Sequence, residues 1–134
     1  MTDLASLLES PSPAVLTTYR RDGSALATPV WFRHQHGAFE VVVAEGDVKL
    51  RHLDRDPRCS LLVFETVPPF RGVEVRGEAE LIPGDVSAIR AEIAGRYLGA
   101  EQGRRFAAER TTPGVLLRLA GDERSWDLSA ILPD

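Results

Sequence analysis

Short apolar runs, either alternating with polar residues or continuous, occupy much of the chain and are typical of β-strands. The first two runs, residues 14–20 and 24–32, flank an Asp22-Gly23 pair. This pair is a strong signal for a β-hairpin because both residues tolerate a positive φ. A third run covers residues 38–44 after a turn at residues 34–37. We therefore expect the chain to begin with an antiparallel meander of three strands.

The rest of the chain continues this pattern. Residues 59–65 form a strongly apolar run, typical of a strand that is buried on both faces. Residues 73–82 alternate apolar and charged side chains and predict a strand with one solvent-facing side, in which Gly77 indicates a bulge or a close approach of another backbone. A last strand is expected over residues 114–120, and residues 124–128 can pair as a short extension. Together these segments predict about six strands.

Helical periodicity is confined to short segments outside these strands. An amphipathic helix is expected over residues 4–9, with Thr2 or Asp3 as its N-cap. A second helix should begin after Asp47, its expected N-cap, and should end near Asp56 because a proline follows.

The longest helix is expected after a second Gly-Asp-Val sequence, at residues 84–86. Apolar side chains then recur at helical spacing at Val86, Ile89, Ile93 and Tyr97. Gly99 is the expected C′ residue, and residues 101–110 should add another turn or two of helix. Strands with a few inserted helices predict a small antiparallel β-barrel. We expect a single domain over residues 1–134, in which residues 1–12 are an N-terminal helix and lead-in.

The composition excludes several classes of protein. The 134 residues carry a net charge of −4, which argues against nucleic acid or an anionic membrane as the main partner. The single cysteine, Cys59, forms no intramolecular disulfide and no cysteine metal cage. The N-terminal residues lack a long apolar stretch, so we expect no signal peptide, no membrane span and a cytoplasmic location. Of the 16 basic residues, only Lys49 is a lysine.

The usual signatures of a self-contained catalytic centre are missing from the sequence. His34, His36 and His52 do not have the spacing of metal ligands, so no metal site is expected. No serine lies in a Gly-x-Ser-x-Gly sequence, and the glycine-rich phosphate loops of Rossmann and P-loop proteins are absent. Hydrolytic chemistry is therefore not expected.

The first candidate site is the strand-to-helix junction at residues 44–58. The N-terminus of a helix concentrates free N–H groups and partial positive charge, and so suits a phosphate. Lys49 and Arg51 fall in the first turn of the expected helix, where a cation is unfavourable unless an anion compensates it. The alternative is a solvated basic helix face, in which Asp47 compensates these cations locally as the cap.

The second candidate site is the segment of residues 28–32. Pro29 cannot donate a hydrogen bond to a neighbouring strand and should lie at an edge or an opening of the sheet. Trp31 and Phe32 follow it and can flank a planar ligand with their rings. The alternative is that both rings fill the core, which is also the default expectation for Tyr97 and Trp126.

Taken together, these segments resemble the pyridoxamine 5′-phosphate oxidase-like family of FMN-binding split barrels, and in particular its branch that uses the deazaflavin coenzyme F420. The resemblance runs in family order from about residue 10 to about residue 120. It rests on residues 14–18 with Asp22-Gly23, and on residues 28–31, 49–58, 75–79 and 96–99. The block from Lys49 to the Asp-Pro-Arg sequence at residues 56–58 is the most specific of these.

The resemblance implies a mainly β fold, a six-stranded antiparallel split β-barrel with inserted short helices, that forms a homodimer with cofactor grooves at the interface. In the family, one strand runs along the ring system of the cofactor, and a strand end and a lysine hold the phosphate side. The implied cofactor-binding residues are Thr28, Pro29, Val30 and Trp31 on the ring side, and Val43, Ala44, Lys49 and Arg51 on the phosphate side. Because the cofactor carries the hydride, no catalytic side chain is expected. Trp126 can act as a wall of the groove in the partner subunit.

One position departs from the family pattern. Several F420-using relatives carry a second basic residue two positions before the family lysine, where this chain has Asp47. An aspartate weakens an anion site unless it turns inward as a helix cap. F420 also carries a polyanionic tail, for which Arg51, Arg55 and Arg58 are the candidate partners. F420 is favoured over FMN, and the choice between the two stays open.

We therefore expect an oxidoreductase that transfers a hydride between F420 or FMN and a small conjugated organic substrate, with no nucleic-acid or membrane partner. Two alternatives stay open. One is a non-catalytic split barrel that binds, stores or senses a flavin-like or tetrapyrrole ligand, since no substrate-specific acid or base is evident. The other is a barrel with an inactive site, of which Asp47 would be the sign.

Overall fold

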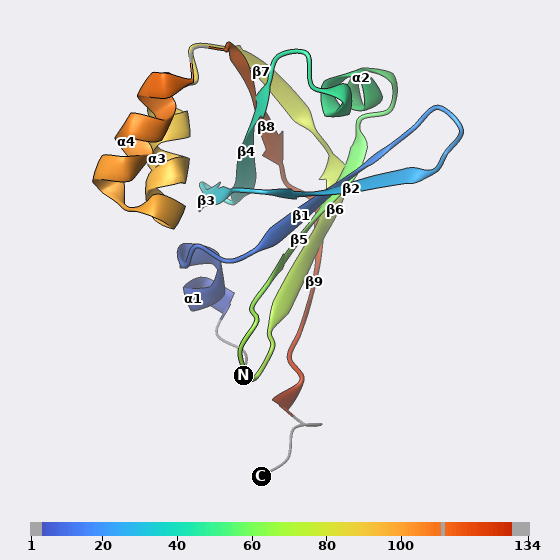
Figure 1. The fold of residues 1–134 in the computed structure, drawn as a ribbon. Helices are drawn as coiled ribbons and strands as arrows, with labels where there is room; N and C mark the ends of the chain where they lie inside the picture. Colours follow the sequence, from blue (N-terminus) through green and yellow to red (C-terminus); the bar gives the residue numbers. More distant parts are fainter. Residues whose placement is uncertain (1–3, 111, 130–134) are drawn as a thin grey trace.

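The structure is a computed structural model that describes residues 4–110 and 112–129. Its helices are α1 (Leu4–Glu9), α2 (Val48–Arg55), α3 (Ser87–Leu98) and α4 (Ala100–Glu109). Its strands are β1 (Ala14–Tyr19), β2 (Ala25–Val30), β3 (Arg33–Gln35), β4 (Ala38–Ala44), β5 (Arg58–Phe64), β6 (Gly72–Glu78), β7 (Glu80–Gly84), β8 (Gly114–Leu119) and β9 (Asp122–Trp126). They form two antiparallel sheets (Figure 1), with the orders β2-β1-β5-β6-β9 and β3-β4-β8-β7.

The mainly β class and the antiparallel pairing are confirmed, but the expected number of six strands is wrong. Nine strands lie within the described part of the chain. The run at residues 73–82 is two strands, because the chain leaves the five-stranded sheet after β6 and enters the four-stranded sheet as β7. Between them, the Ala79 amide donates a hydrogen bond to the Pro57 carbonyl at 2.8 Å. The short β3 was also not expected, and β9 begins at Asp122 instead of Arg124.

At Gly77 the backbone of β6 closely approaches the backbone at Ala120, as a glycine within a strand had predicted. A Cβ atom at this position would lie 2.5 Å from the carbonyl oxygen of Ala120. The backbone of β6 therefore passes the corner between β8 and β9 at a distance that only a glycine allows.

Burial along β5 corrects a second expectation. Cys59, Leu61 and Val63 are at most 3% exposed, whereas the residues between them are half-buried. The strand therefore has one fully buried face and not two. An apolar run fixes the presence of a strand, but how far each face is covered depends on distant segments of the chain.

The hydrophobic core lies between the two sheets. Its members come from both sheets and from the segment between β2 and β3, and they include Leu16, Phe32, Phe39, Val41, Leu61, Val63, Val73, Val75, Leu117 and Leu119. Burying one aliphatic or aromatic side chain of this kind stabilises the fold by about 1.5–3 kcal/mol. Leu7 of α1 and Leu53 of α2 belong to the same cluster, so both short helices are held by tertiary packing.

Helix α2 begins and ends as the sequence predicted. The Asp47 carboxylate caps it by accepting a hydrogen bond from the Lys49 amide at 2.9 Å, and the helix ends at Arg55. Helix α1 also has its predicted bounds, whereas its expected caps, Thr2 and Asp3, lie outside the described residues.

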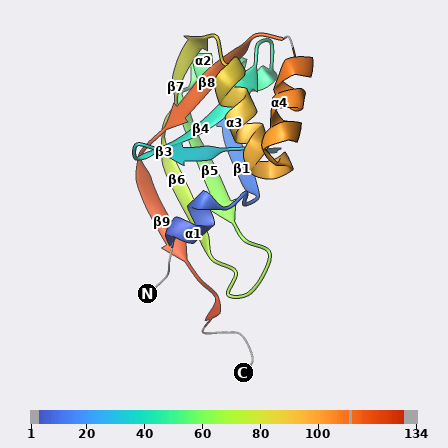
Figure 2. The ribbon, with the colours of Figure 1, turned by 90° about the vertical axis from the view of Figure 1, so that its left-hand side faces the viewer.

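Helices α3 and α4 form a hairpin that stands beside β3 and β4 (Figures 1 and 2). They meet at Gly99, whose φ of 89° is the conformation that favours glycine after a helix. Gly103 lies against the backbone of Gly95, because a Cβ atom there would be 2.5 Å from the Gly95 Cα. Helix α4 is longer than the one or two turns expected. No helix in the described residues is long and apolar enough to span a membrane.

Candidate functional site

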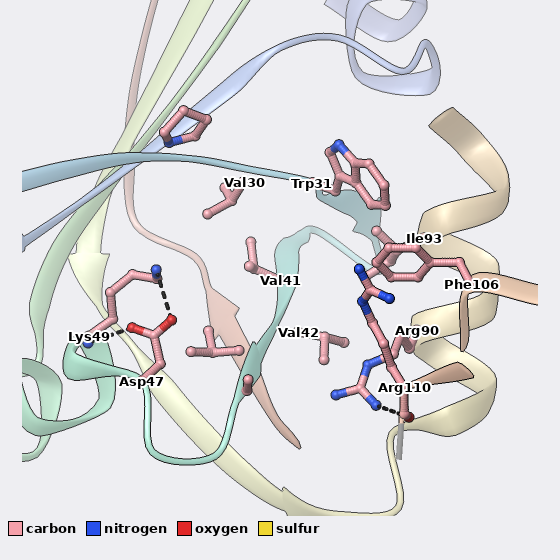
Figure 3. A pocket seen from close by; sticks show the side chains of 13 residues that line it. Val30, Trp31, Val41, Val42, Asp47, Lys49, Arg90, Ile93, Phe106 and Arg110 are labelled. Atoms are coloured by element: carbon pink, nitrogen blue, oxygen red, sulfur yellow. Dashed lines mark hydrogen bonds and ion pairs between the residues drawn. The ribbon is translucent and has the colours of Figure 1, made fainter. Parts of the chain in front are cut away.

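A cavity of about 280 Å³ opens between the end of β2, the strand β4, the N-terminus of α2 and the α3–α4 hairpin (Figure 3). Its lining combines an apolar floor with charged side chains at two opposite ends. The lining residues are Pro29, Val30, Trp31, Val41, Val42, Val43, Ala44, Asp47, Lys49, Arg90, Ile93, Phe106 and Arg110. An apolar pocket with a few polar groups at defined places is the usual form of a small-molecule site.

The structure separates the two neighbouring aromatic residues that follow β2. Phe32 is fully buried in the core, whereas Trp31 is half-buried and lines the cavity. The Trp31 ring stacks on Tyr97 with ring centroids 5.1 Å apart, and it lies 5.1 Å from the tilted ring of Phe106. Phe32 therefore fills the core, as one interpretation had it, whereas Trp31 lines the cavity, and its contact with a planar ligand stays a prediction.

Tyr97 fixes this aromatic wall through its hydroxyl group. The hydroxyl donates a hydrogen bond to the Ser12 carbonyl at 2.9 Å and accepts one from the Phe32 amide at 3.3 Å. Burial raises the pKa of Tyr97, so the phenol stays protonated and can donate. Trp31 therefore stacks on a ring that is tied to the backbone at two points.

Lys49 lies at the opposite end of the cavity, and Asp47 is its partner. The Lys49 Nζ is 3.1 Å from the Asp47 Oδ2, while the Oδ1 of the same carboxylate caps α2. The side chains of Lys49 and Asp47 are 14% and 29% exposed. Asp47 turns inward as a cap, as the sequence allowed, and it also neutralises the lysine that the cavity would offer to an anion.

This pairing leaves Lys49 able to bind an anion. A lysine ammonium group has three N–H donors, and the described structure uses one of them on Asp47. The site also lies at the N-terminus of α2, where the helix dipole adds partial positive charge. The lysine end can therefore hold a phosphate, with an affinity that the neighbouring carboxylate lowers.

The structure brings six of the eight predicted cofactor-binding residues to this cavity. They are Pro29, Val30, Trp31, Val43, Ala44 and Lys49. Arg51 points elsewhere: it is exposed on α2 and does not line the cavity. Thr28 also does not line the cavity, and its buried Oγ1 has no hydrogen-bond partner among the described residues. A buried hydroxyl without a partner is costly, but its burial also keeps it from a ligand in the cavity in this structure.

Three lining residues from α3, α4 and the residue after α4 were not singled out from the sequence, namely Arg90, Phe106 and Arg110. Arg90 lies on the same face of α3 as Val86 and Ile93. An arginine within an otherwise apolar helix face could have marked it in the sequence as a candidate site residue. Phe106 and Arg110 are four residues apart at the end of α4, in a segment where only a turn or two of helix was expected.

A second, larger hollow adjoins the cavity along the Trp31 side. It has a volume of about 700 Å³ and shares Pro29, Val30, Trp31 and Phe106 with the cavity. Its remaining lining is mostly apolar and consists of Pro11, Pro13, Ala14, Val15, Phe64 and Tyr97. We call this hollow the apolar groove. A ligand with a flat ring and a charged end can thus occupy the groove and the cavity together.

The remaining titratable candidates have structural environments. Burial raises the pKa of the Cys59 thiol to about 11, which makes it a poor nucleophile. His52 is buried and lies 2.9 Å from the Thr18 hydroxyl through its Nδ1. No group of three or more His, Cys, Asp or Glu side chains forms a metal-site cluster within residues 4–110 and 112–129. Trp126 lies over Gly72 and lines neither the cavity nor the apolar groove of its own chain.

Comparisons with solved structures place this fold among split barrels of several kinds. A conserved hypothetical protein of Mycobacterium tuberculosis, Rv2991, is 25% identical, with a TM-score of 0.82 over 100% of this chain and 90% of that chain. An F420 reductase is 23% identical, with a TM-score of 0.75 over 92% of this chain and 98% of that chain. HutZ, a heme storage protein of Vibrio cholerae, is 14% identical, with a TM-score of 0.67 over 92% of this chain and 91% of that chain.

Sequence comparison gives the family directly. None of the curated proteins matches the chain. Residues 2–122, nearly the whole chain, match the family described as pyridoxamine 5′-phosphate oxidase. The chain therefore belongs to the pyridoxamine 5′-phosphate oxidase family, as its strand, lysine and Asp-Pro-Arg segments had suggested.

Proposed function

We propose that this chain is an oxidoreductase that binds F420 or FMN and transfers a hydride between that cofactor and a small conjugated organic substrate. The observation that carries the proposal is the placement of Lys49 at the N-terminus of α2, facing an apolar cavity whose far wall is aromatic. A flavin-type cofactor has the same division, with a flat apolar ring system at one end and a phosphate at the other.

The residues of the cavity fit such a cofactor on two counts. Lys49 and the helix dipole suit the phosphate, and Pro29, Val30 and Trp31 offer an apolar strand for the ring side. The cavity alone is small for a whole flavin nucleotide, but the adjoining apolar groove supplies the additional space.

The cofactor would supply the hydride chemistry, and the protein would supply orientation and exclusion of water. This division agrees with the side chains present, because the described lining residues include no nucleophile next to a general base. Among the described lining residues Asp47 is the one carboxylate, and it is occupied with the helix cap and with Lys49. We favour F420, in line with the F420 reductase among the similar folds.

We further propose that the protein is a homodimer in which a second chain covers the apolar groove. The groove is open in one chain, and its exposed apolar lining would otherwise face water beside the ring of the cofactor. Trp126, which is 37% exposed, is the candidate wall from the partner subunit. Analytical ultracentrifugation is expected to give twice the mass of the chain, and a monomer with full cofactor affinity would contradict this part of the proposal.

A second candidate function is non-catalytic binding or storage of a flavin-like or tetrapyrrole ligand. The observation in its favour is that none of the described lining residues is an acid or base free to act on a substrate. The fold itself serves storage in HutZ, a heme storage protein.

Turnover separates the two functions. The protein should be loaded with reduced F420 or reduced FMN and offered conjugated enones and quinones, with the oxidation of the cofactor followed by absorbance. The proposal predicts oxidation that depends on both enzyme and acceptor. Binding of a cofactor without oxidation by any acceptor would favour storage, and failure to bind either cofactor would overturn both flavin-based proposals.

A further inference from the structure

The end of the cavity formed by the α3–α4 hairpin carries two arginines that the proposed cofactor contacts do not use. Arg90 extends from α3 and Arg110 follows α4, and both line the cavity opposite Lys49 and Asp47 (Figure 3). Figure 3 shows the valines of β4 between the two charged ends. A ligand that spans the cavity would therefore meet positive charge at both ends.

Arg90 is held in place through one side of its guanidinium group. Its Nη1 donates to the carbonyl groups of Arg110 and Thr112, at 3.2 and 3.1 Å. Its Nη2 lies so close to Gly114 that a Cβ atom there would be 2.7 Å away. These contacts fix the orientation of the guanidinium group, and the described structure assigns no partner to its Nε or Nη2.

Arg110 is held by an aromatic ring and makes no side-chain hydrogen bond in the described structure. Its guanidinium carbon is 3.8 Å from the centroid of the Phe106 ring, which is a close cation–π contact. All of its N–H donors are therefore available to a ligand. Phe106 is in turn 5.1 Å from Trp31, so the arginine continues the aromatic wall of the cavity.

No carboxylate forms an ion pair with either arginine within residues 4–110 and 112–129. This distinguishes them from Lys49, which pairs with Asp47, and from other arginines such as Arg33 and Arg71, which pair with glutamates. The same two arginines also line a hollow of about 690 Å³ on the other side, together with Arg104. Asp85, whose carboxylate accepts a hydrogen bond from the Ser87 amide at 2.9 Å, is the carboxylate among the described lining residues of this hollow, and it forms no ion pair with Arg90 or Arg110.

We infer that Arg90 and Arg110 form an oxyanion-binding site at the hairpin end of the cavity, which takes a carboxylate or phosphate group on a planar, conjugated ligand. The planar guanidinium fork matches both groups, and Phe106 and Trp31 offer flat apolar contact to the attached ring or conjugated chain. The inference deepens the proposed function, on which it rests, because it gives the class of molecule expected in this part of the cavity. The oxyanion belongs either to the substrate or to a second anionic group of the cofactor.

Arg110→Gln is the variant for the test, because the Arg110 side chain holds no backbone group. Arg105→Gln is the matched control, since Arg105 lies on α4, is exposed and lines neither the cavity nor the adjoining hollows. The probe is benzoate, a planar carboxylate, titrated into the ¹⁵N-labelled full chain while the arginine Nε–H signals are followed by NMR. Equal melting temperatures of both variants and the wild type would show that the fold is intact.

We expect saturable shifts of the Arg90 and Arg110 signals, and a benzoate affinity that falls by about tenfold or more in Arg110→Gln but not in Arg105→Gln. Shifts that do not saturate, or an equal loss in both variants, would overturn the inference. Because benzoate needs no cofactor, saturable binding by a protein that binds neither F420 nor FMN would refute the proposed function and leave the oxyanion site standing.

Cofactor titrations then identify the source of the oxyanion. If the site serves the cofactor, Arg110→Gln weakens F420, which carries anionic groups beyond its phosphate, by about tenfold and leaves FMN, whose single phosphate is assigned to Lys49, unchanged. If it serves the substrate, all cofactor affinities stay at the wild-type value and only benzoate binding to the loaded protein falls. An Arg110→Gln protein that matches the wild type in every one of these titrations would overturn the inference.

Discussion

The two ends of the cavity carry the same sign of charge but are built in different ways. Lys49 is part of a local unit, in which Asp47 two residues earlier both caps the helix and pairs with the ammonium group. Arg90 and Arg110 are brought together from different segments by carbonyl groups and an aromatic ring. The lysine end is therefore fixed by local sequence and partly neutralised, whereas the arginine end depends on the packing of the α3–α4 hairpin and forms no ion pair within the described residues.

The largest expected effect comes from a substitution that disturbs only the α3–α4 hairpin, because the arginine end depends on that hairpin and the lysine end does not. Gly103→Ala would place a methyl group against the backbone of Gly95, which cannot move aside as a side chain can. We expect a loss of about 1–3 kcal/mol in the free energy of unfolding, measured by urea denaturation. The affinity of the Arg90 and Arg110 site for an anion should fall as well, while the structure around Lys49 and α2 should stay unchanged.

Gly95→Ala is the matched control for that substitution. The nearest atom to a Cβ at Gly95 is the Ala100 Cα at 3.6 Å, which is ordinary van der Waals contact. Alanine is also the better helix former, so stability should stay equal or rise by up to about 1 kcal/mol. Equal destabilisation by both alanines would show that the contact between the two helices does not hold the hairpin.

A smaller effect is expected from removing the countercharge at the lysine end. Asp47→Asn retains an N-cap side chain of similar strength but leaves Lys49 without its ion pair. Affinity for FMN should rise by roughly two- to fivefold, in keeping with the modest worth of a partly exposed ion pair. The measurement is a fluorescence titration.

Asp54→Asn is the control, because it makes the same change of charge at an exposed position of α2. Its effect on FMN affinity should be negligible at physiological salt. A lower affinity in Asp47→Asn would contradict the prediction and would show that the carboxylate serves mainly to orient Lys49.

The smallest expected effect is a dependence of folding stability on pH, caused by His52 of α2, the helix that carries Lys49. His52 of α2 is buried against Thr18 of β1, and burial, followed by the charges of Arg55, Arg20 and Arg51, lowers its pKa below 6.5. In the unfolded chain the imidazole binds a proton more readily, so its contribution to stability is complete above about pH 6.5 and falls as the pH drops through the folded-state pKa.

The expected result is a lower urea midpoint at about pH 5.5 than at about pH 7 in the wild type, and a smaller difference in His52→Gln. This window excludes the carboxyl groups of Asp56 and Glu65, whose pKa values are lowered to about 2 by hydrogen bonds from Arg58 and Arg71. An identical pH dependence in both proteins would show that His52 is not the group responsible.

The difference between the two ends also explains how much of the site could be predicted. The cap at Asp47, the bounds of α2 and the place of Lys49 follow from rules that act within a few residues, and the sequence showed them. The fold class and the family followed from several such segments in order. Arg90, Phe106 and Arg110 meet only through the packing of two helices, and no local pattern gives that packing.

The same limit explains the errors in the fold. The sequence showed strands at residues 73–82 and 59–65 correctly, but not that the first divides between two sheets or that the second has only one buried face. It also left Trp31 and Phe32 as equal candidates, because which ring faces the core depends on the path of the chain after β2. The role of Trp126, the homodimer and a cytoplasmic location stay predictions.

The central claim, that Lys49 anchors the phosphate of a flavin-type cofactor, is tested most directly by titrating F420 and FMN into Lys49→Gln and the wild type. Arg51→Gln is the control, since Arg51 is on the same helix, exposed and outside the cavity. We predict that the wild type binds at least one cofactor, that Lys49→Gln loses about 1.5–3 kcal/mol of binding free energy, about tenfold or more in affinity, and that Arg51→Gln stays near the wild type. Equal affinity of Lys49→Gln and the wild type would contradict the account.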